Sequence, residues 1–476
     1  MKEYFYYVGG EFRKSLEKIP TVNPATEEEI AYFYETDLND LEFALNKAKE
    51  AQKIWQHTPF LERAKVLRQI NQVILENLST LAELETKEIG KPLKESLFVD
   101  IPLGAECFIY YAGLLETISS KKYETQFGID IIEYQPFGIN GVFLPYNVPL
   151  MIFGFNCAAS LASGNALVIK PSEFGSLSIL ELCNYLDKID LPKGLINVIT
   201  GKGQTVGRFL AKSKIDLISF TGSLSTLKSI IQETVSYPKK IICELGGCNI
   251  AVVFLDADLE KAKENIFSSC FIKSGQMCIG TSLILIEEEV YKDFINNFIK
   301  KCNSLKIGNP LLAETNFGPM VSKRHLEDID RKVKDLINKD KAKVLYGGFP
   351  LKEKGFFYSP TVLELKEIIY EEFFGPVVMV KSFKRKDIEK ILDDNPTALV
   401  LQLWSKDLNF IYNLAKRTQY PTVWLNTFAQ MSSLTEFGGA RLSGWGRNLG
   451  VSGFLEYCQA KHIGVSTKTT PTEGWF

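Results

Sequence analysis

Apolar side chains recur with a helical period along much of the first hundred residues. In Leu41–Trp55 and Glu62–Leu78 they occupy positions i, i+3 and i+4, which fall on one face of a helix. A short β-like opening and the turn sequence Asn23-Pro24-Ala25-Thr26 precede them. We therefore predict a mainly helical beginning with two amphipathic helices.

From about Ile139 the pattern changes to short β-branched runs separated by helical stretches, which is typical of βαβ units and a parallel sheet. We predict strands over Gly141–Leu144, Leu167–Ile169, Ile196–Thr200, Leu217–Phe220 and Ile250–Phe254. After Gly280 the rhythm repeats, with a strand over Leu283–Ile286, a helix over Val290–Leu305, and strands over Val377–Lys381 and Val423–Asn426. Because 476 residues exceed one simple core, we expect two α/β domains with a boundary near Leu245–Gly247.

Two segments do not follow this rhythm. Leu150–Ile169 has no charged residue over about the length of a membrane span, but it contains a Ser-Gly-Asn turn at 163–165. We interpret it as a buried helix followed by a strand over Ala166–Ile169, and not as a membrane segment. Tyr123–Tyr134 alternates between apolar and polar positions, which predicts a protruding strand that contacts another subunit.

The composition is that of an ordinary soluble enzyme. Hydrophobic residues make up 45% of the chain and charged residues 24%, and the formal net charge is −2. So small a charge gives no electrostatic basis for binding nucleic acid or an anionic membrane. The nine cysteines include no Cys-x-x-Cys pair, so they predict free thiols in a reducing cytoplasm. The N-terminus lacks the apolar stretch of a signal peptide.

Cys278 is the first candidate for chemistry, in the turn-like tetrad Gly275-Gln276-Met277-Cys278. A thiol acts as a nucleophile only where its pKa is lowered. A glycine in such a turn lets the backbone approach a substrate closely. The alternative is a buried, unreactive cysteine, which is the usual state of free cysteines.

Two other turns supply groups that such a nucleophile needs. Glu244 is followed by Leu245-Gly246-Gly247, so its carboxylate can enter a cleft uncrowded and act as a general base on water. Asn147 stands between the two prolines of Pro145–Pro149, which hold its amide in one orientation, as an oxyanion hole requires. Each motif alone is more typical of a plain turn or a helix cap. No histidine adjoins them, so no metal site is predicted.

Cofactor candidates follow three successive strands of the first domain. Lys170-Pro171-Ser172-Glu173 closes one strand, and Gly201–Gly207 follows the next with the spacing GxGxxxG. Phe220-Thr221-Gly222-Ser223 comes after a third strand, where backbone N–H groups and the serine hydroxyl can hold a phosphate. Each is also a plausible turn or cap, but three at successive strand ends favour a nucleotide site.

One further motif, Glu371–Pro376, places acids before an aromatic pair and a Gly-Pro stop. Its Glu372 can accept hydrogen bonds from a ribose, while Phe374 can pack on a sugar or nicotinamide face. The alternative is a helix end with a core aromatic residue.

In this order, the motifs resemble the aldehyde dehydrogenase superfamily, in its hydrolytic NAD(P)-dependent branch. The resemblance covers nearly the whole chain. It runs through Asn23–Thr26, Glu88–Pro92, Pro145–Pro149, Lys170–Glu173, Phe220–Ser223, Glu244–Gly247, Gly275–Cys278, Glu371–Pro376, Phe437–Gly439, Ser443–Arg447 and Tyr457–Lys461.

The resemblance implies a role for each matching residue. Cys278 is the nucleophile that forms a thiohemiacetal and then a thioester, Glu244 is the general base, and Asn147 holds the oxyanion with the Cys278 backbone N–H. The expected cofactor-binding residues are Lys170, Glu173, Gly203, Gly207, Phe220, Ser223, Glu372 and Phe374. The expected substrate tunnel is lined by Val148, Ile152, Phe155, Met277, Ile279 and Phe437.

The resemblance also implies an architecture, with a Rossmann-like nucleotide-binding domain, an α/β catalytic domain and a small β oligomerisation arm. We expect the first over 1–117 and 137–246, with 443–457 returning to it, the second over 247–442, and the arm over 118–136 and 458–476. The arm implies a homodimer or homotetramer. Glu173 favours NAD over NADP, because a carboxylate at the adenosine ribose repels a 2′-phosphate, while Lys170 beside it leaves NADP as the alternative.

The expected substrate is a small-molecule aldehyde. The family often has an aromatic residue where Val148 stands and a proline where Glu436 stands, both near the expected tunnel. The apolar tunnel residues favour an aliphatic or aromatic aldehyde, whereas Glu436 favours a cationic aminoaldehyde.

Two rival functions are an enzyme that transfers the acyl group to coenzyme A, and a family member retained only for binding or structure. Glu244 argues against the first, since that enzyme needs no water-activating base. The joint presence of Cys278, Glu244 and Asn147 argues against the second.

Overall fold

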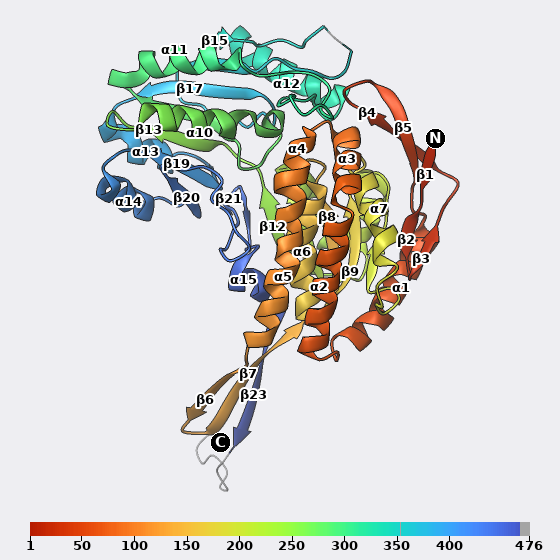
Figure 1. Cartoon of the computed structure of the whole chain (residues 1–476). Helices are drawn as coiled ribbons and strands as arrows, with labels where there is room; N and C mark the ends of the chain where they lie inside the picture. Colours follow the sequence, from red (N-terminus) through yellow and green to blue (C-terminus); the bar gives the residue numbers. More distant parts are fainter. Residues whose placement is uncertain (353, 467–476) are drawn as a thin grey trace.

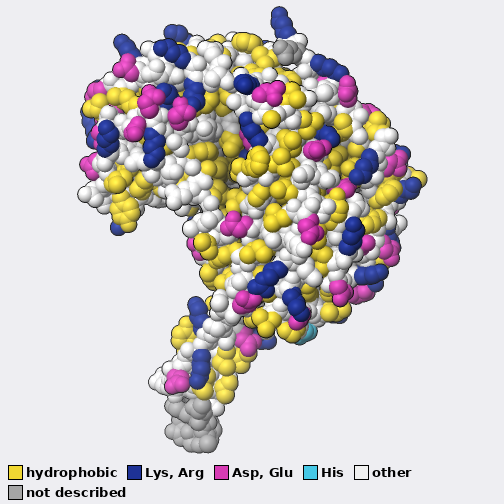
Figure 2. Space-filling view, viewed as in Figure 1, with side chains coloured by type: hydrophobic (Ala, Val, Ile, Leu, Met, Phe, Trp, Pro, Cys, Tyr) yellow, Lys and Arg dark blue, Asp and Glu magenta, His cyan; other side chains and the backbone are white. Residues whose placement is uncertain are grey.

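The computed structural model describes residues 1–352 and 354–466. It contains two large sheets covered by helices, and a narrow three-stranded arm projects from the body (Figure 1). Both large sheets are built mainly from parallel strands, so the predicted α/β class is confirmed. Positive and negative side chains are interspersed over the face in Figure 2, in keeping with the net charge of −2.

The first sheet has the strand order β22-β12-β11-β8-β9-β10-β2-β3. Its five central strands are parallel: β8 (Ile139–Leu144), β9 (Ala166–Pro171), β10 (Ile196–Val198), β11 (Leu217–Gly222) and β12 (Lys240–Leu245). The edges are antiparallel: β2 (Tyr6–Val8), β3 (Glu11–Arg13) and β22 (Gly444–Trp445). Since β8 comes first in the chain but lies between β9 and β11, the winding direction reverses there. A Rossmann-like sheet binds its ligand at the carboxyl ends of the strands beside such a reversal.

Helices pack against this sheet on both sides (Figure 1). The helices of this part of the chain are α1 (Leu38–Trp55), α2 (Phe60–Glu76), α3 (Leu78–Ile89), α4 (Leu93–Glu95), α5 (Ile101–Thr117), α6 (Pro149–Ser163), α7 (Leu177–Leu186), α8 (Arg208–Lys212) and α9 (Leu224–Thr234). The helix predicted to end at Leu78 instead ends at Glu76, because Asn77 leaves helical geometry and its amide donates to the Val73 carbonyl. All 15 residues of α6 are buried, which confirms the buried-helix interpretation of this uncharged segment.

Among the described residues, Leu93–Thr117 has the length and the mean hydropathy, 1.4, of a candidate membrane span. Its α5 packs directly against α6, since a side chain on Gly154 would collide with the Gly104 backbone. A π-helical turn at Ser96–Asp100 and a buried charge at Asp100 also interrupt the segment. These features are those of a core helix in a folded domain.

The second sheet has the strand order β15-β16-β17-β14-β13-β19-β20. Six strands are parallel: β13 (Asn249–Val253), β14 (Thr281–Glu287), β16 (Thr361–Leu365), β17 (Val377–Phe383), β19 (Val400–Trp404) and β20 (Thr422–Leu425), and the edge strand β15 (Ala342–Tyr346) is antiparallel. Its helices are α10 (Leu259–Phe271), α11 (Tyr291–Cys302), α12 (Lys323–Asn338), α13 (Ile388–Asp393) and α14 (Leu408–Arg417). Alternate residues of β13 enter two hydrophobic cores, so both faces of this sheet are covered.

The arm consists of β6 (Lys121–Thr125), β7 (Gly128–Pro136) and β23 (Cys458–Ser466), in the order β23-β7-β6. The prediction of a single strand over Tyr123–Tyr134 was therefore wrong. The chain reverses at Gln126-Phe127, where Gly128 takes a φ of 142° that other residues rarely adopt, and a hairpin results. Residues 467–476 of the expected arm lie outside the described residues.

Short elements complete the fold. Strands β1 (Lys2–Tyr4), β4 (Lys18–Asn23) and β5 (Glu28–Tyr34) form a small sheet, and β18 (Thr397–Ala398) pairs with β21 (Ala440–Arg441). After the second sheet the chain returns to the first, because β22 pairs with β12, and α15 (Gly450–Glu456) then packs on α6.

Candidate active site

The three predicted catalytic residues come from three distant parts of the chain. Asn147 follows the carboxyl end of β8, Glu244 lies near the carboxyl end of β12, and Cys278 precedes β14. The site therefore forms where the carboxyl ends of the first sheet face the amino ends of the second. Each residue projects from a strand end fixed by its own sheet.

The loop before Cys278 has an unusual backbone. After α10, Lys273 (φ 51°), Ser274 (φ 53°) and Gly275 (φ 76°) all adopt left-handed conformations. The glycine is required, since a side chain there would collide with the Gly375 carbonyl. The first two are not glycines, so the surrounding structure must hold them in a conformation that costs about 1–3 kcal/mol each.

Gln276 connects this loop to its surroundings, a role that the sequence analysis did not assign. Its side-chain oxygen accepts from the Val321 N–H (3.0 Å), and its side-chain amide donates to the Pro319 carbonyl (3.2 Å). Asn147 Nδ2 donates to the backbone carbonyl of Gln276 at 2.9 Å. The Asn147 amide is thus tied to the nucleophile loop, and one of its two amide protons remains to donate elsewhere.

Asn249, the first residue of β13, is a second residue that sequence reasoning missed. Its Nδ2 donates to the carbonyls of Cys278 (2.6 Å) and Gly280 (2.9 Å), and its Oδ1 accepts from the Val400 N–H (3.0 Å). The available signal was its position, five residues after Glu244 at the start of the next strand in the chain. It fixes the backbone on which Cys278 stands.

Cys278 is half-buried, whereas the other eight cysteines are buried. Burial raises the pKa of its thiol to about 12, and the negative charges of Glu244 and Glu372 act in the same direction. The sequence predicts a nucleophile with a lowered thiol pKa, whereas burial and these charges raise the pKa in the structure. Both carboxyls thus act electrostatically on the same thiol.

Glu244 lies in a tight polar pocket. Its Oε2 accepts from the Gly439 N–H at 3.2 Å, while its Oε1 is buried and has no partner among the described residues. A side chain on Gly438 would come within 2.7 Å of that oxygen, so the two glycines make room for the carboxyl. Burial raises its pKa well above the usual range, against a smaller opposite effect from Arg447.

The expected nicotinamide-ribose residues adjoin this pocket. The Glu372 carboxyl lies against Gly246, two residues beyond Glu244, and burial raises its pKa to about 7. Phe374 has a φ of 49°, its carbonyl lies 2.8 Å from His325 Nε2, and its ring meets the Tyr146 ring edge-on at 6.0 Å. The segment is thus held firmly enough to present both side chains.

The adenosine end gathers around Lys170. This side chain is buried, its Nζ donates to the Pro171 carbonyl (2.8 Å), and it lies 3.8 Å from Glu173 Oε2. Burial lowers its pKa, and the charges of Glu173 and Glu35 oppose that effect. A side chain on Gly207 would reach within 3.5 Å of it, whereas Gly203 faces open space.

Glu35 was not predicted from the sequence. It is buried, it accepts a hydrogen bond from Thr205, and its Oε2 has no partner among the described residues. Thr205 belongs to the π-helical turn Gly203–Gly207, so this carboxylate lies beside the GxGxxxG segment. The unpaired buried oxygen of Glu35 and the open space at Gly203 fit a polar ligand such as an adenosine ribose.

Phe220 and Ser223 both have clear structural roles at the end of β11. The Phe220 ring packs on Phe143 at 6.2 Å and covers Gly222, where an added side chain would approach it to 2.7 Å. Ser223 is the N-cap of α9, and its hydroxyl accepts from the Thr226 N–H at 3.2 Å. The helix start that it caps is the type of position that binds phosphate.

The six expected tunnel residues all belong to one hydrophobic cluster, against which Cys278 also packs. They are 1–8% exposed: Val148, Ile152, Phe155, Met277, Ile279 and Phe437. Glu436 is exposed, and its Oε1 accepts from the backbone and hydroxyl of Ser452 at the start of α15 (3.3 and 3.1 Å). Across residues 1–352 and 354–466, no group of three or more His, Cys, Asp or Glu side chains is arranged to hold a metal ion.

Comparison with known proteins gives consistent results. Residues 12–463 match the model of the aldehyde dehydrogenase family. The chain is 36% identical to the betaine aldehyde dehydrogenase of Bacillus subtilis (strain 168) over 96% of this chain and 95% of the relative. It is 34% identical to a chloroplastic aminoaldehyde dehydrogenase of Arabidopsis thaliana, over 99% and 97% of the two chains.

Solved structures agree with this result. An NAD⁺ complex of an aldehyde dehydrogenase from Bacillus cereus superposes with a TM-score of 0.95, 29% identity, and coverage of 98% of this chain and 97% of that chain. A betaine aldehyde dehydrogenase from Staphylococcus aureus in complex with NAD⁺ gives a TM-score of 0.95 and 31% identity, over 99% and 96% of the two chains.

Proposed function

Because the chain belongs to the aldehyde dehydrogenase family and is an NAD(P)-dependent aldehyde dehydrogenase, we propose that Cys278, Glu244 and Asn147 carry out its reaction. The enzyme oxidises an aldehyde to a carboxylic acid with NAD as the cofactor. The observation that carries the assignment is that side chains from three distant parts of the chain come together at one site. The Asn147 amide binds the loop of Cys278, and the Glu244 carboxyl is close enough to raise the thiol pKa.

Cys278 acts first in this proposal. The thiol gives its proton to solvent, the sulfur then attacks the carbonyl carbon, and the carbonyl oxygen becomes an alkoxide. Asn147 Nδ2 and the Cys278 backbone N–H donate to that oxygen, and removal of one such donor typically costs about 10²–10³ in rate. When bound, the cofactor supplies a cationic nicotinamide ring that accepts the hydride leaving this carbon. Cys278 then carries a thioester.

Glu244 acts in the second half of the reaction. Its unpartnered Oε1 accepts a proton from water as the water oxygen attacks the thioester carbon. The carbon–sulfur bond breaks, the carboxylic acid leaves, and the proton passes back through Glu244 to the sulfur or to solvent. A carboxyl pKa raised by burial makes Glu244 a stronger base than an exposed carboxylate.

Two substitutions test these assignments. Cys278→Ala should lower NADH formation by about 10⁴-fold or more, because no other group supplies the covalent step. Glu244→Gln should give one burst of NADH equal to the enzyme concentration and then almost none, because the thioester persists. Cys302→Ala and Glu287→Gln serve as matched controls that retain turnover. Steady full turnover by Glu244→Gln would overturn the base assignment.

For the cofactor, we propose that Lys170 and Glu173 bind the adenosine ribose and that Glu372 and Phe374 hold the nicotinamide ribose. The carboxylate of Glu173, with that of Glu35 nearby, favours NAD over NADP through repulsion of a 2′-phosphate. A ratio of kcat/KM for NAD to that for NADP well above one would support this assignment, and a ratio below one would overturn it.

For the substrate, the six buried apolar residues of the expected tunnel, which belong to the hydrophobic cluster against which Cys278 packs, favour an aliphatic or aromatic aldehyde. A cationic aminoaldehyde is the second candidate. It is favoured by the exposed carboxylate of Glu436 beside Phe437 and by the names of the betaine aldehyde and aminoaldehyde relatives. The kcat/KM values for hexanal, benzaldehyde, betaine aldehyde and 3-aminopropanal distinguish the two. If the second holds, Glu436→Gln should lower kcat/KM for the cations only.

We also propose the domain boundaries given above, a cytoplasmic location and a homodimer or homotetramer joined through the arm. Exposed apolar side chains on the arm support this: Tyr123, Phe127 and Val465 are 52%, 56% and 48% exposed. Sedimentation of the whole chain tests the assembly, and a monomer at micromolar concentration would overturn it.

A further inference from the structure

A buried cluster of charges lies directly behind the nucleophile loop. Glu85, Lys91, Glu95, Asp100 and Lys273 are each no more than 9% exposed. Glu85 lies in α3, the next three lie between α3 and α5, and Lys273 comes from the loop that leads to Cys278. Ionised groups so deeply buried are retained only when they are paired and bonded.

Lys273 is attached to this cluster at two points. Its Nζ lies 3.0 Å from Asp100 Oδ1 and 4.0 Å from Glu95 Oε2. Its backbone N–H donates to Glu95 Oε1 at 3.2 Å. Lys273 is the first of the two non-glycine residues with a left-handed backbone, so these contacts hold it at the position where the backbone is strained. They supply the outside support that this loop conformation needs.

The same cluster reaches the other side of the active site. Asp100 Oδ2 accepts from Lys91 Nζ at 2.8 Å, and Lys91 Nζ lies 2.5 Å from Glu85 Oε2. Glu85 Oε1 accepts from the Leu150 N–H at 3.1 Å, in the first turn of α6 and three residues after Asn147.

The bond from Asn147 Nδ2 to the Gln276 carbonyl closes this series into a ring. The ring runs from the Asn147 turn through Gln276 and Lys273 to Asp100, Lys91, Glu85 and back to α6. Both the nucleophile and the oxyanion donor are therefore positioned by one set of buried charges.

The charges within the cluster are consistent with this arrangement. Three acids face two lysines. Burial raises the pKa of Glu95, whereas the two lysines hold the pKa of Asp100 below its usual range although burial opposes them.

We propose that Lys273 is a positioning residue for the nucleophile, and that its contacts with Asp100 and Glu95 hold the left-handed loop that sets Cys278 beside Asn147. Lys273 touches neither substrate nor cofactor in this proposal. It acts through the backbone of Lys273–Cys278. The inference rests on the assignment of Cys278 as the nucleophile.

The test compares Lys273→Met, which keeps the length and loses the charge, with Arg385→Met, which removes a structural cation from the far end of the second sheet. Lys273→Met should lower kcat by about 10- to 100-fold, because a small misplacement of reacting groups has that effect. KM for NAD should change by less than about twofold. Alkylation of Cys278 by iodoacetamide should be about threefold faster, because the relaxed loop exposes the thiol. Lys273→Arg should restore most of kcat.

Arg385→Met should change the thermal midpoint but neither kcat nor the alkylation rate. If Lys273→Met does not fold, Glu85→Gln replaces it, since this change removes one of the three acids and keeps the shape. It should lower kcat several-fold at unchanged KM for NAD.

A folded variant of either kind with the kcat and the alkylation rate of the parent would overturn the proposal. The alkylation rate is measured without turnover, so it reports on how Lys273 holds the loop whether or not Cys278 is the nucleophile. It therefore stays informative even if Cys278→Ala retains activity. That retention alone would overturn the proposed function.

Discussion

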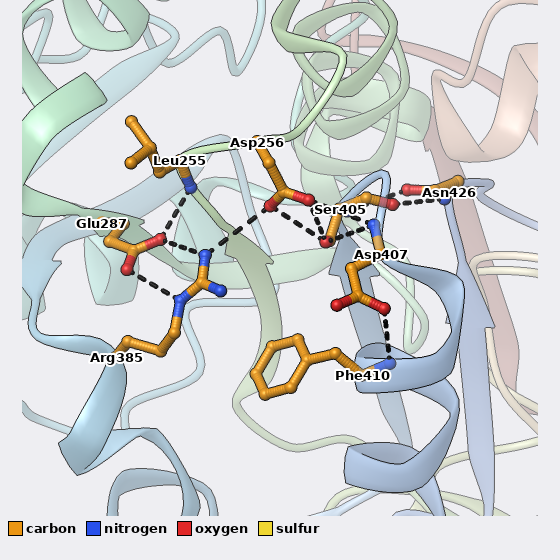
Figure 3. Close-up of polar contacts among 8 residues, drawn as sticks. All are labelled: Leu255, Asp256, Glu287, Arg385, Ser405, Asp407, Phe410 and Asn426. Carbon is orange, nitrogen blue, oxygen red and sulfur yellow. Dashed lines mark hydrogen bonds and ion pairs between the residues drawn. The ribbon is translucent and has the colours of Figure 1, made fainter.

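The two ends of the second sheet carry polar clusters of opposite character. At the carboxyl ends of its strands, Figure 3 shows a cluster formed by Asp256, Glu287, Arg385, Ser405, Asp407 and Asn426. At the amino ends lie Asn249 and Cys278, which face Glu244 from the first sheet. Parallel sheets usually bind ligands at their carboxyl ends. That rule alone would predict a ligand site at the carboxyl-end cluster of the second sheet, and not at the amino ends where Cys278 lies.

The cluster in Figure 3 satisfies its own hydrogen-bonding groups. Both Glu287 oxygens accept from Arg385 at 2.9 Å, and Oε2 also accepts from the Leu255 N–H at 2.7 Å. Both Asp256 oxygens accept from the Ser405 hydroxyl, at 2.9 and 2.8 Å. The Arg385 guanidinium also lies over the Phe254 and Phe410 rings.

The amino-end cluster differs because it is incomplete. Glu244 Oε1 is buried without a partner among the described residues, and the Asn147 amide keeps one proton to donate. A buried polar group that is left unpaired costs stability, so its presence indicates a function. The unpartnered Glu244 oxygen and the free Asn147 proton, more than strand polarity, support the proposed active site at the amino ends.

Among the substitutions that test this difference between the two clusters, Asn147→Ala should have the largest effect on kcat. Loss of the oxyanion donor should lower kcat by about 10²–10³-fold, with a much smaller change in KM for NAD. Asn140→Ala is the matched control. Asn140 is buried at the other end of the same strand and donates to Ser160 and Ser219. Equal losses of kcat in the two variants would mean that Asn147 is merely structural.

The sequence was sufficient to predict elements and motifs whose information is local. Alternating strands and helices indicated both sheets, and the residues around Cys278, Glu244 and Asn147 marked turns with the right chemistry. The arm shows a limit, because the two-residue turn at Gln126-Phe127 has no typical turn sequence. The pattern of alternation therefore continued through a reversal of the chain.

Long-range contacts set the other limits. Asn249 and Gln276 act through backbone carbonyls that the fold brings to them, and no periodicity of side chains records such contacts. The thiol pKa also depends on burial and on Glu244 and Glu372, which lie far from Cys278 in the chain. Lys273 looks like a surface lysine in the sequence, and only its neighbours from α4 and the following turn show otherwise.

Asn249→Ala should have an intermediate effect. It removes the two bonds that hold the carbonyls of Cys278 and Gly280, so kcat should fall roughly tenfold, equivalent to about 1.4 kcal/mol in transition-state energy. Asn395→Ala is a fair comparison, because Asn395 is also buried and donates to the Cys248 carbonyl and Tyr420 hydroxyl. If both variants lose stability alike but only Asn249→Ala loses kcat, the asparagine of β13 positions the nucleophile.

Arg385→Met has the smallest expected effect, and it tests whether the cluster at the carboxyl ends of the second sheet is purely structural. The Arg385 side chain is 42% exposed, so loss of its paired bonds to Glu287 should cost about 1 to 2 kcal/mol of unfolding free energy and leave kcat unchanged.

The pH dependence of that loss follows from the carboxyl groups. Although burial alone would raise it, the bonds from Arg385 lower the pKa of Glu287 below its usual 4.5. A lowered carboxyl pKa stabilises the fold above the unfolded-state value, and this stabilisation disappears as the pH falls through the folded-state value. Urea unfolding of the parent and the variant should therefore show a gap that is constant near neutral pH and shrinks below about pH 4. A gap that persists in acid would mean that Arg385 stabilises mainly by packing on Phe254 and Phe410.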